Sequence, residues 1–238
     1  MDSATAILMT TAATVGLGHT LVGPDHYLPF IMMSRAQGWR MPKTLGVTVL
    51  CGIGHVLSSI VLGLIGIAAG WALTRMKGIE GTRGEWAAWG LIAFGLLYAV
   101  WGLWHARKGR THTHRHLHDV GQPHEHEHDH HSEHAHVHAD AARPASITPW
   151  VLFVVFVLGP CEPLIPLMVA AAAKGTWLSV TVVAGTFSLV TVATMTAVVL
   201  AASLGLKQVR FAFAQRYMHA IAGGVIALSG LAIKALGL

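Results

Sequence analysis

The segment between His19 and His26 combines metal-ligating side chains with residues that break helices. It reads HTLVGPDH and closes a long apolar run. Pro24 lacks a backbone N–H and crowds the carbonyl four residues earlier, which predicts a break in a helix at this point. On an unbroken helix His19 and His26 share one face, and a break lets Asp25 turn inward as well. Two imidazoles and a carboxylate suit a borderline divalent cation such as nickel, cobalt or zinc.

The apolar surroundings strengthen this interpretation. An ionisable side chain at the centre of a membrane span costs about 2.5–3.5 kcal/mol on insertion scales. Three such residues within the eight positions of HTLVGPDH therefore indicate a use. The alternative is that the segment lies at the level of the lipid headgroups, where His and Asp cost little.

His55 stands near the middle of the next apolar run, directly after Gly54. Together with His19, Asp25 and His26 it would complete a four-ligand set of nitrogen and oxygen donors. Because a permeant ion must leave again, such a site should be incomplete or labile. The alternative role for His55 is a hydrogen bond to a neighbouring helix.

Cys161 and Glu162 occupy the corresponding place in the second half of the chain, within the segment GPCEPLIP. Glu162 is predicted to be a metal ligand, a proton acceptor or a counter-charge. Cys161 is interpreted either as a soft metal ligand or as a small buried apolar residue.

A histidine-rich stretch separates the two halves. Between residues 112 and 138 it holds twelve histidines interleaved with acidic residues. This composition cannot build an apolar core, so we expect it to be disordered without metal. Imidazoles at this density bind zinc, nickel, cobalt or copper at interchangeable sites, so the stretch is interpreted as a metal buffer or sensor; a pH-sensing segment is the alternative. The predicted loop ligands are His112, His114, His116, His118, His124, His126, His128, His130, His131, His134, His136 and His138.

The composition places the rest of the chain in a membrane. Of 238 residues, 53% are hydrophobic and only 11% are charged, against about 25% charged residues in soluble domains. The formal charge of +5 is scattered between apolar runs, which is typical of membrane flanks and does not favour a nucleic-acid partner. The first apolar run lacks a preceding basic region, so we expect it to remain as a span rather than be cleaved.

Six apolar runs are long enough to span a bilayer, which needs about 20 residues. We therefore predict an all-α polytopic membrane protein. Its domains would be a first repeat (1–105), a cytoplasmic histidine-rich loop (106–146) and a second repeat (147–238). The expected spans are approximately 4–33, 44–73, 86–105, 148–173, 177–205 and 211–237.

The distribution of cations predicts the orientation. The loops after the first, third and fifth runs carry eleven Lys and Arg residues, and the opposite side carries five. The positive-inside rule then places the long loop in the cytoplasm and both termini outside the plasma or inner membrane. Arg83 belongs to the flanks expected outside.

The two halves share a pattern. Gly23-Pro24-Asp25-His26 and Gly159-Pro160-Cys161-Glu162 both interrupt an apolar run with Gly-Pro and two polar residues. Because each half holds three spans, a repeat would be inverted across the membrane. Matched interruptions of this kind are the best sequence indication of a transporter's central site.

These motifs resemble the nickel/cobalt transporter family, in particular six-span efflux members with a His-rich loop. The resemblance rests on HTLVGPDH, on Ile53-Gly54-His55, on the His-rich loop and on GPCEP. It implies that His19, Asp25, His26 and His55 recognise the metal. The wider spacing of His19 and Asp25 departs from that of the uptake members.

The segment GPCEPLIPL also resembles the PCxxP-type motif of the membrane thiol-disulfide reductases of cytochrome c biogenesis. Those proteins use one cysteine in each half, whereas this chain has Asp25 at the corresponding place in the first half. The likeness implies a related architecture. Cys51, the second cysteine, lies elsewhere in the second run.

The sequence thus favours a secondary permease for Ni²⁺ or Co²⁺, with Zn²⁺ as a further substrate and efflux as the preferred direction. It predicts no enzyme activity, no tightly bound cofactor, and the ion and the lipid bilayer as partners, and it is compatible with a homo-oligomer. Glu162 or Asp25 would carry a coupled proton. The alternatives are a nickel uptake permease, an accessory protein of urease or hydrogenase maturation, and a membrane thiol-disulfide oxidoreductase.

Overall fold

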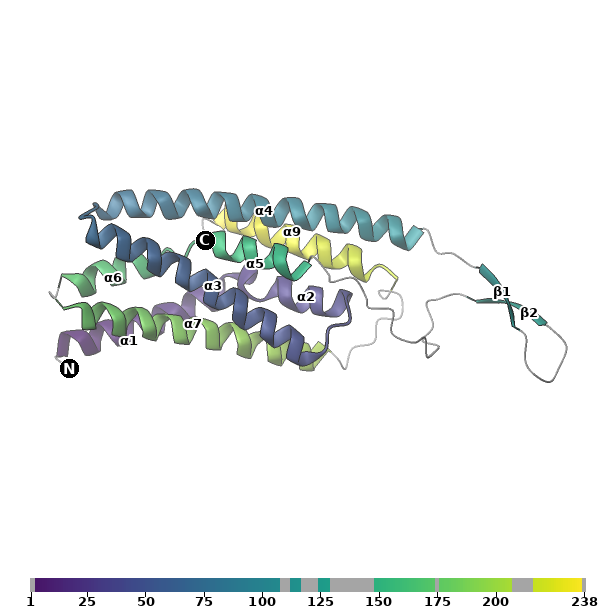
Figure 1. The fold of residues 1–238 in the computed structure, drawn as a ribbon, viewed down its shortest axis with the longest axis horizontal. Coiled ribbons are helices and arrows are strands. Elements are labelled where there is room, and N and C mark those ends of the chain that lie inside the picture. Colours follow the sequence, from purple (N-terminus) through teal and green to yellow (C-terminus); the bar gives the residue numbers. More distant parts are fainter. Residues whose placement is uncertain are drawn as a thin grey trace.

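The computed structural model describes residues 3–107, 112–116, 124–128, 148–173, 176–206 and 216–236. Within these residues the chain forms an elongated bundle whose helices run along its long axis (Figure 1). In chain order the elements are α1 (Ser3–Val22), the 3₁₀ helix η1 (Pro24–His26), α2 (Leu28–Ala36), α3 (Met41–Ala68), α4 (Leu73–Arg107), β1 (His112–His116), β2 (His124–His128), α5 (Thr148–Leu158), α6 (Leu164–Ala172), α7 (Trp177–Leu206) and α9 (Met218–Leu236).

The composition of these helices fits a lipid environment. Among the described residues, α1, α3, α4, α7 and α9 are each long and apolar enough to cross a membrane, and α5 is a shorter apolar helix. Large apolar side chains such as Trp86, Leu97 and Leu178 point away from the bundle and are about 70% exposed. An α-helix pairs its backbone groups internally, as the hydrocarbon interior of a membrane requires. The apolar outer faces can then contact lipid. The prediction of a helical polytopic membrane protein is confirmed.

The first and fourth predicted spans are broken, as their prolines indicate. α1 ends at Val22, a single 3₁₀ turn follows, and α2 begins at Leu28. In the second half α5 ends at Leu158 and α6 begins at Leu164. Both breaks lie part-way along the bundle rather than at its ends (Figure 1).

The third span is longer than the sequence indicated. α4 begins at Leu73, whereas the apolar run predicts a start at 86. Its first turns carry charged residues that lower the hydropathy, but the structure pairs them. Glu80 forms an ion pair with Arg83, and Glu85 pairs with Lys234 of α9. The last helix begins at Met218, and the predicted start at 211 lies outside the described residues.

Helices from the two halves pack against each other. α1 packs along α7, α5 along α3, and α4 along α9. If the two halves are exchanged, α1 takes the place of α5, α3 that of α7 and α4 that of α9. The α1–α7 pair then becomes the α5–α3 pair, and the α4–α9 pair is unchanged. This packing is compatible with an inverted repeat, which remains a prediction.

Two short pieces of the histidine-rich stretch differ from the expected disorder. β1 and β2 pair antiparallel, with His112 opposite His128 and His116 opposite His124. In both pieces His alternates with Thr, Arg or Glu, and this period of two suits a β-strand. The prediction of disorder considered only the lack of an apolar core and overlooked this alternation. Residues 108–111, 117–123 and 129–147, with the remaining loop histidines, lie outside the described part of the chain.

Glycines allow α4 and α9 to approach closely. A Cβ atom added at Gly223 would overlap the backbone of Ala99, and one added at Gly95 would overlap the backbone of Ala227. Small residues at such crossings are typical of membrane helices, where close backbone packing replaces the hydrophobic effect as the driving force.

We therefore expect Gly223→Val to destabilise the bundle, because overpacking costs about 1–3 kcal/mol or more. Gly224→Val is the matched control, since a Cβ at the neighbouring Gly224 meets no atom within 4 Å. The measurement is thermal unfolding of the purified protein in detergent. Equal midpoints for the two variants would contradict the close approach.

Candidate metal centre

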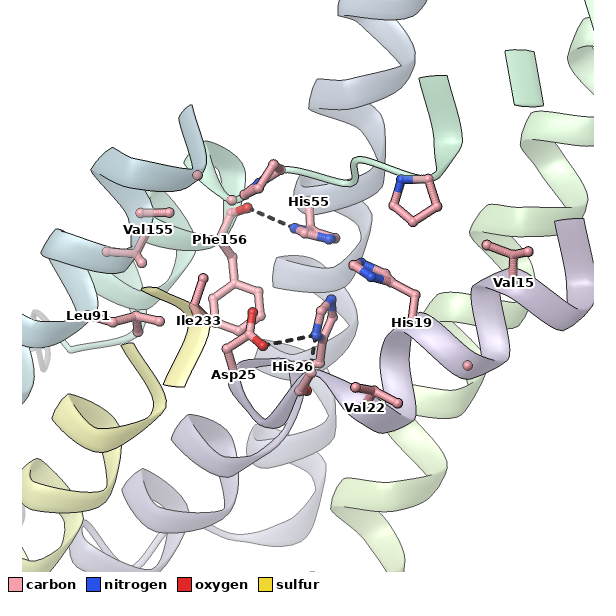
Figure 2. Close-up of a pocket in the computed structure, with 17 residues that line it drawn as sticks. Val15, His19, Val22, Asp25, His26, His55, Leu91, Val155, Phe156 and Ile233 are labelled. Atoms are coloured by element: carbon pink, nitrogen blue, oxygen red, sulfur yellow. Dashed lines mark hydrogen bonds and ion pairs between the residues drawn. The ribbon is translucent and has the colours of Figure 1, made fainter. Parts of the chain in front are cut away.

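Three imidazoles from three separate elements converge in the interior of the bundle. His19 lies in the last turn of α1, His26 ends the 3₁₀ turn, and His55 lies in α3. Figure 2 shows the three rings facing one another across one cavity. One ligand nitrogen from each ring lies within 4.8 Å of the other two. The sequence predicted these three residues as ligands, and the break at Pro24 brings the first two together.

The hydrogen bonds of the rings leave nitrogen lone pairs free. The Nδ1 of His55 lies 3.3 Å from the carbonyl oxygen of Phe156, and the Nδ1 of His26 lies 3.1 Å from that of Gly23. When Nδ1–H donates to a carbonyl, Nε2 carries the lone pair, which is the usual arrangement in metal-bound histidine. The Nε2 atoms of both His26 and His55 are buried and have no hydrogen-bond partner among the described residues. A buried polar atom without a partner costs free energy unless a ligand satisfies it.

Asp25 stands behind His26. Its Oδ1 lies 3.3 Å from the Nδ1 of His26, and its side chain is 20% exposed. The group of converging ligand atoms comprises only the three histidines among the described residues. Asp25 was predicted as a ligand alongside them, and the structure places it where it can orient His26 and balance part of a cation's charge.

The two predicted site residues of the second half behave differently from each other. Cys161 is fully buried, and its Sγ lies 3.8 Å from the Nε2 of His19, so the thiol is at the edge of the cluster. Glu162 is exposed and lies outside the cavity lining. The structure therefore brings Cys161, but not Glu162, to the histidines.

The cavity around the histidines is mostly apolar and has a volume of about 260 Å³. Val15 and Val22 of α1, Leu91 of α4, Phe156 of α5 and Ile233 of α9 contribute to its wall. This space is larger than the share of one water molecule, about 30 Å³, so an ion can keep some of its water. Three nitrogen donors with open positions beside them are an arrangement that suits a transition metal.

Gly23 makes the turn possible by its lack of a side chain. A Cβ atom at this position would lie 2.5 Å from the Nδ1 of His26 and 2.9 Å from the Oδ1 of Asp25. Its φ of −81° is open to any residue, so the requirement is space for the imidazole and not backbone conformation.

Sequence reasoning missed a buried ion pair near the second break. Glu80 is 1% exposed, and its Oε1 accepts a hydrogen bond from Arg83 Nη1 at 2.8 Å. Hydropathy placed both residues outside the spans. Their spacing of three residues on a helix was the signal that could have found the pair.

Comparison with protein families matches residues 28–232 to the family described as cytochrome C biogenesis protein transmembrane region. The chain belongs to this family. The match covers most of the bundle, including His55, Glu80 and Cys161, but begins after His19 and His26. No curated protein and no solved structure matches the chain.

Membership of the cytochrome c biogenesis family bears on the two resemblances unequally. It supports the likeness that GPCEPLIPL indicated and lends no support to the nickel/cobalt transporter family. A membrane location follows from the family and from the apolar helices, whereas the sidedness of the loop and the termini remains a prediction.

The two cysteines lie apart in the packing. Both are free and buried. Cys51 packs in a cluster with Phe30, Leu152 and Met195, and Cys161 belongs to a second cluster that includes Phe187. A disulfide requires Cα atoms within about 7 Å with their side chains directed at each other, so a Cys51–Cys161 bond would require rearrangement of these clusters.

We expect Gly23→Ala to weaken metal binding, because its methyl group would push the imidazole of His26 out of the cluster. Gly46→Ala is the control, since a Cβ at this exposed glycine of α3 meets nothing within 4 Å. The measurement is titration of the detergent-solubilised protein with Co²⁺, followed by visible absorption, with the twelve loop histidines replaced by Ala in both variants so that only the cluster reports. Equal affinity of the two variants would argue against the role of Gly23.

Proposed function

We propose that this protein is a membrane permease that binds a divalent transition-metal ion at His19, His26 and His55 and passes it across the bilayer. One observation carries the proposal: three imidazoles meet in the interior of the bundle, and two of them hold buried Nε2 atoms that find no partner in the described part of the chain. Imidazole nitrogen is a good ligand for Ni²⁺, Co²⁺ and Zn²⁺ and a poor one for Mg²⁺ or Ca²⁺.

The distances describe an open form of the site. Two nitrogens bound to one ion at about 2.1 Å lie at most about 4.2 Å apart. Because the nitrogens lie up to 4.8 Å apart, the three rings must move closer together to bind one ion. Because His26 belongs to a short 3₁₀ turn, that turn can supply the adjustment without moving a long helix.

The electrostatics favour passage over permanent capture. Neutral imidazoles contribute no charge, and Asp25 supplies one negative charge beside His26. A divalent ion would thus remain incompletely neutralised in an apolar cavity, which limits its residence. Histidines of β1 and β2 and of the rest of the loop would collect ions before they enter the bundle.

Within this proposal, Ni²⁺ or Co²⁺ as the substrate and efflux as the direction rest on the resemblance of the sequence motifs alone. Neither the family match nor the geometry of three imidazoles distinguishes these ions from Zn²⁺. Delivery of nickel to an enzyme under maturation is compatible with the same site.

Family membership favours a second candidate function, a membrane thiol-disulfide oxidoreductase, over metal transport. In that reaction Cys161 and Cys51 would form a disulfide, and the two electrons and two protons that they lose would reduce a partner disulfide to two thiols. Cys161 would be the attacking sulfur, because its backbone lies at a helix break. Its full burial means that a partner could reach it only after the α5–α6 break has opened.

The permease is tested by metal flux into sealed vesicles that contain the purified protein. Wild type should carry Co²⁺, Ni²⁺ or Zn²⁺, and His26→Ala should reduce flux to that of protein-free vesicles, because the cluster loses its central ring. His105→Ala, which removes an exposed histidine at the end of α4, should transport normally. If His26→Ala carries all three ions as wild type does, the permease proposal is wrong.

Substitution of the cysteines separates the two candidates. A permease should keep its flux in Cys51→Ser, since Cys51 packs away from the histidines. A thiol oxidoreductase should lose disulfide exchange with a partner thiol protein in Cys161→Ser, as followed by mass-tagging of free thiols after oxidation. A Cys51–Cys161 disulfide in the oxidised wild type, together with no metal flux by wild type, would favour the oxidoreductase.

A further inference from the structure

The guanidinium of Arg83 binds the helix break that forms one wall of the histidine cavity. Its Nη2 donates to the carbonyl oxygen of Val157 at 2.7 Å and of Gly159 at 3.4 Å. These carbonyls belong to the end of α5, where Pro160 removes a backbone donor. Arg83 therefore satisfies carbonyls that have no partner in the next turn of helix.

Arg83 also reaches His55 through a hydroxyl. The Oγ of Ser58 accepts a hydrogen bond from Arg83 Nη2 and donates to the backbone carbonyl of His55 at 2.8 Å. On the other side, the Nδ1 of His55 bonds to Phe156, the residue before Val157. The guanidinium is thus linked to the backbone of His55 by hydrogen bonds through Ser58. It is linked to the ring of His55 through the backbone that joins Phe156 to Val157.

Glu80 fixes Arg83 in this position. The Glu80 carboxylate is 1% exposed, whereas the Arg83 side chain is 19% exposed. A carboxylate buried in an apolar bundle is costly unless it is paired, and removal of one partner leaves the other charge buried and uncompensated. Because Arg83 uses Nη1 for Glu80 and Nη2 for the carbonyls, its planar fork joins the two sets of contacts.

We infer that Arg83 and Glu80 are positioning residues of the metal centre, which orient His55 through Ser58 and the Val157–Gly159 segment. The inference rests on the proposed function, because it concerns the same site. In metal sites, residues that hold the ligands in place without touching the ion matter for binding, and their loss typically lowers affinity about 10–100-fold. The ion pair would act in this way.

Charge alone and positioning predict opposite results for Arg83. If the pair acted only through its field, Arg83→Gln would remove a positive charge and tighten the binding of a cation, while Glu80→Gln would weaken it. If the pair positions His55, both substitutions should weaken binding, because each leaves the Val157 and Gly159 carbonyls without their partner and lets the His55 ring change its orientation. Arg83→Lys keeps the charge but lacks the fork, so it should also bind more weakly than wild type.

The test is Co²⁺ titration of the detergent-solubilised full-length protein, followed by visible absorption. Wild type and variants alike carry Ala in place of the twelve loop histidines, so that Co²⁺ bound by the loop does not mask the cluster in the bundle. We expect about tenfold weaker binding in Glu80→Gln and in Arg83→Gln, with an intermediate value for Arg83→Lys. Glu85→Gln is the matched control. It removes an acid of the same helix that is 59% exposed and paired with Lys234, and it should bind as wild type does.

The outcomes separate this inference from the proposed function. Wild-type affinity in both Glu80→Gln and Arg83→Gln, or tighter binding in Arg83→Gln, would overturn the positioning role while leaving the metal site in place. Absence of Co²⁺ binding by wild type would instead overturn the proposed function. If Arg83→Gln does not fold, Ser58→Ala tests the same link to His55, and wild-type affinity in that variant would count against the inference.

Discussion

A hydrocarbon environment leaves no water for an unpaired backbone group, and this constraint determines what can happen where a membrane helix breaks. Each break in this protein frees carbonyls and amides that a continuous helix would pair. The structure supplies partners for them from side chains. His26 bonds to the carbonyl of Gly23, Arg83 binds those of Val157 and Gly159, and Ser59 accepts the amide of Cys161 at 3.2 Å. The chemistry-bearing residues are thereby tied to the breaks.

Much of the architecture could be predicted because the relevant signals are local. Apolar run lengths located the helices, and Pro24 and Pro160 located the breaks. Charged residues in the first turns of α4 caused the main error, because hydropathy counts each charge as if it were unpaired. The pairing of Glu85 with Lys234 links helices far apart in sequence, and no pattern within α4 reports it.

The site was predicted in part for a similar reason. The ligand types and the break placed His19, Asp25 and His26 near one another, but only the fold decides that Asp25 stands behind His26 while His55 completes the cluster. Glu162 was chosen by its place in a repeated motif. The turn after Pro160 exposes Glu162 and buries its neighbour Cys161. A comparison of motifs does not specify which of two neighbouring side chains faces the interior.

The last helix gives the centre a dependence on the order of synthesis. Ile233 of α9 closes part of the cavity wall, and α9 packs against both η1 and α2. His19 and His26 leave the ribosome well before α9, yet α9 completes their surroundings. Until α9 has inserted, that wall is missing and the imidazoles stay open on that side. The enclosed form of the cavity is thus reached only after α9 has joined the bundle.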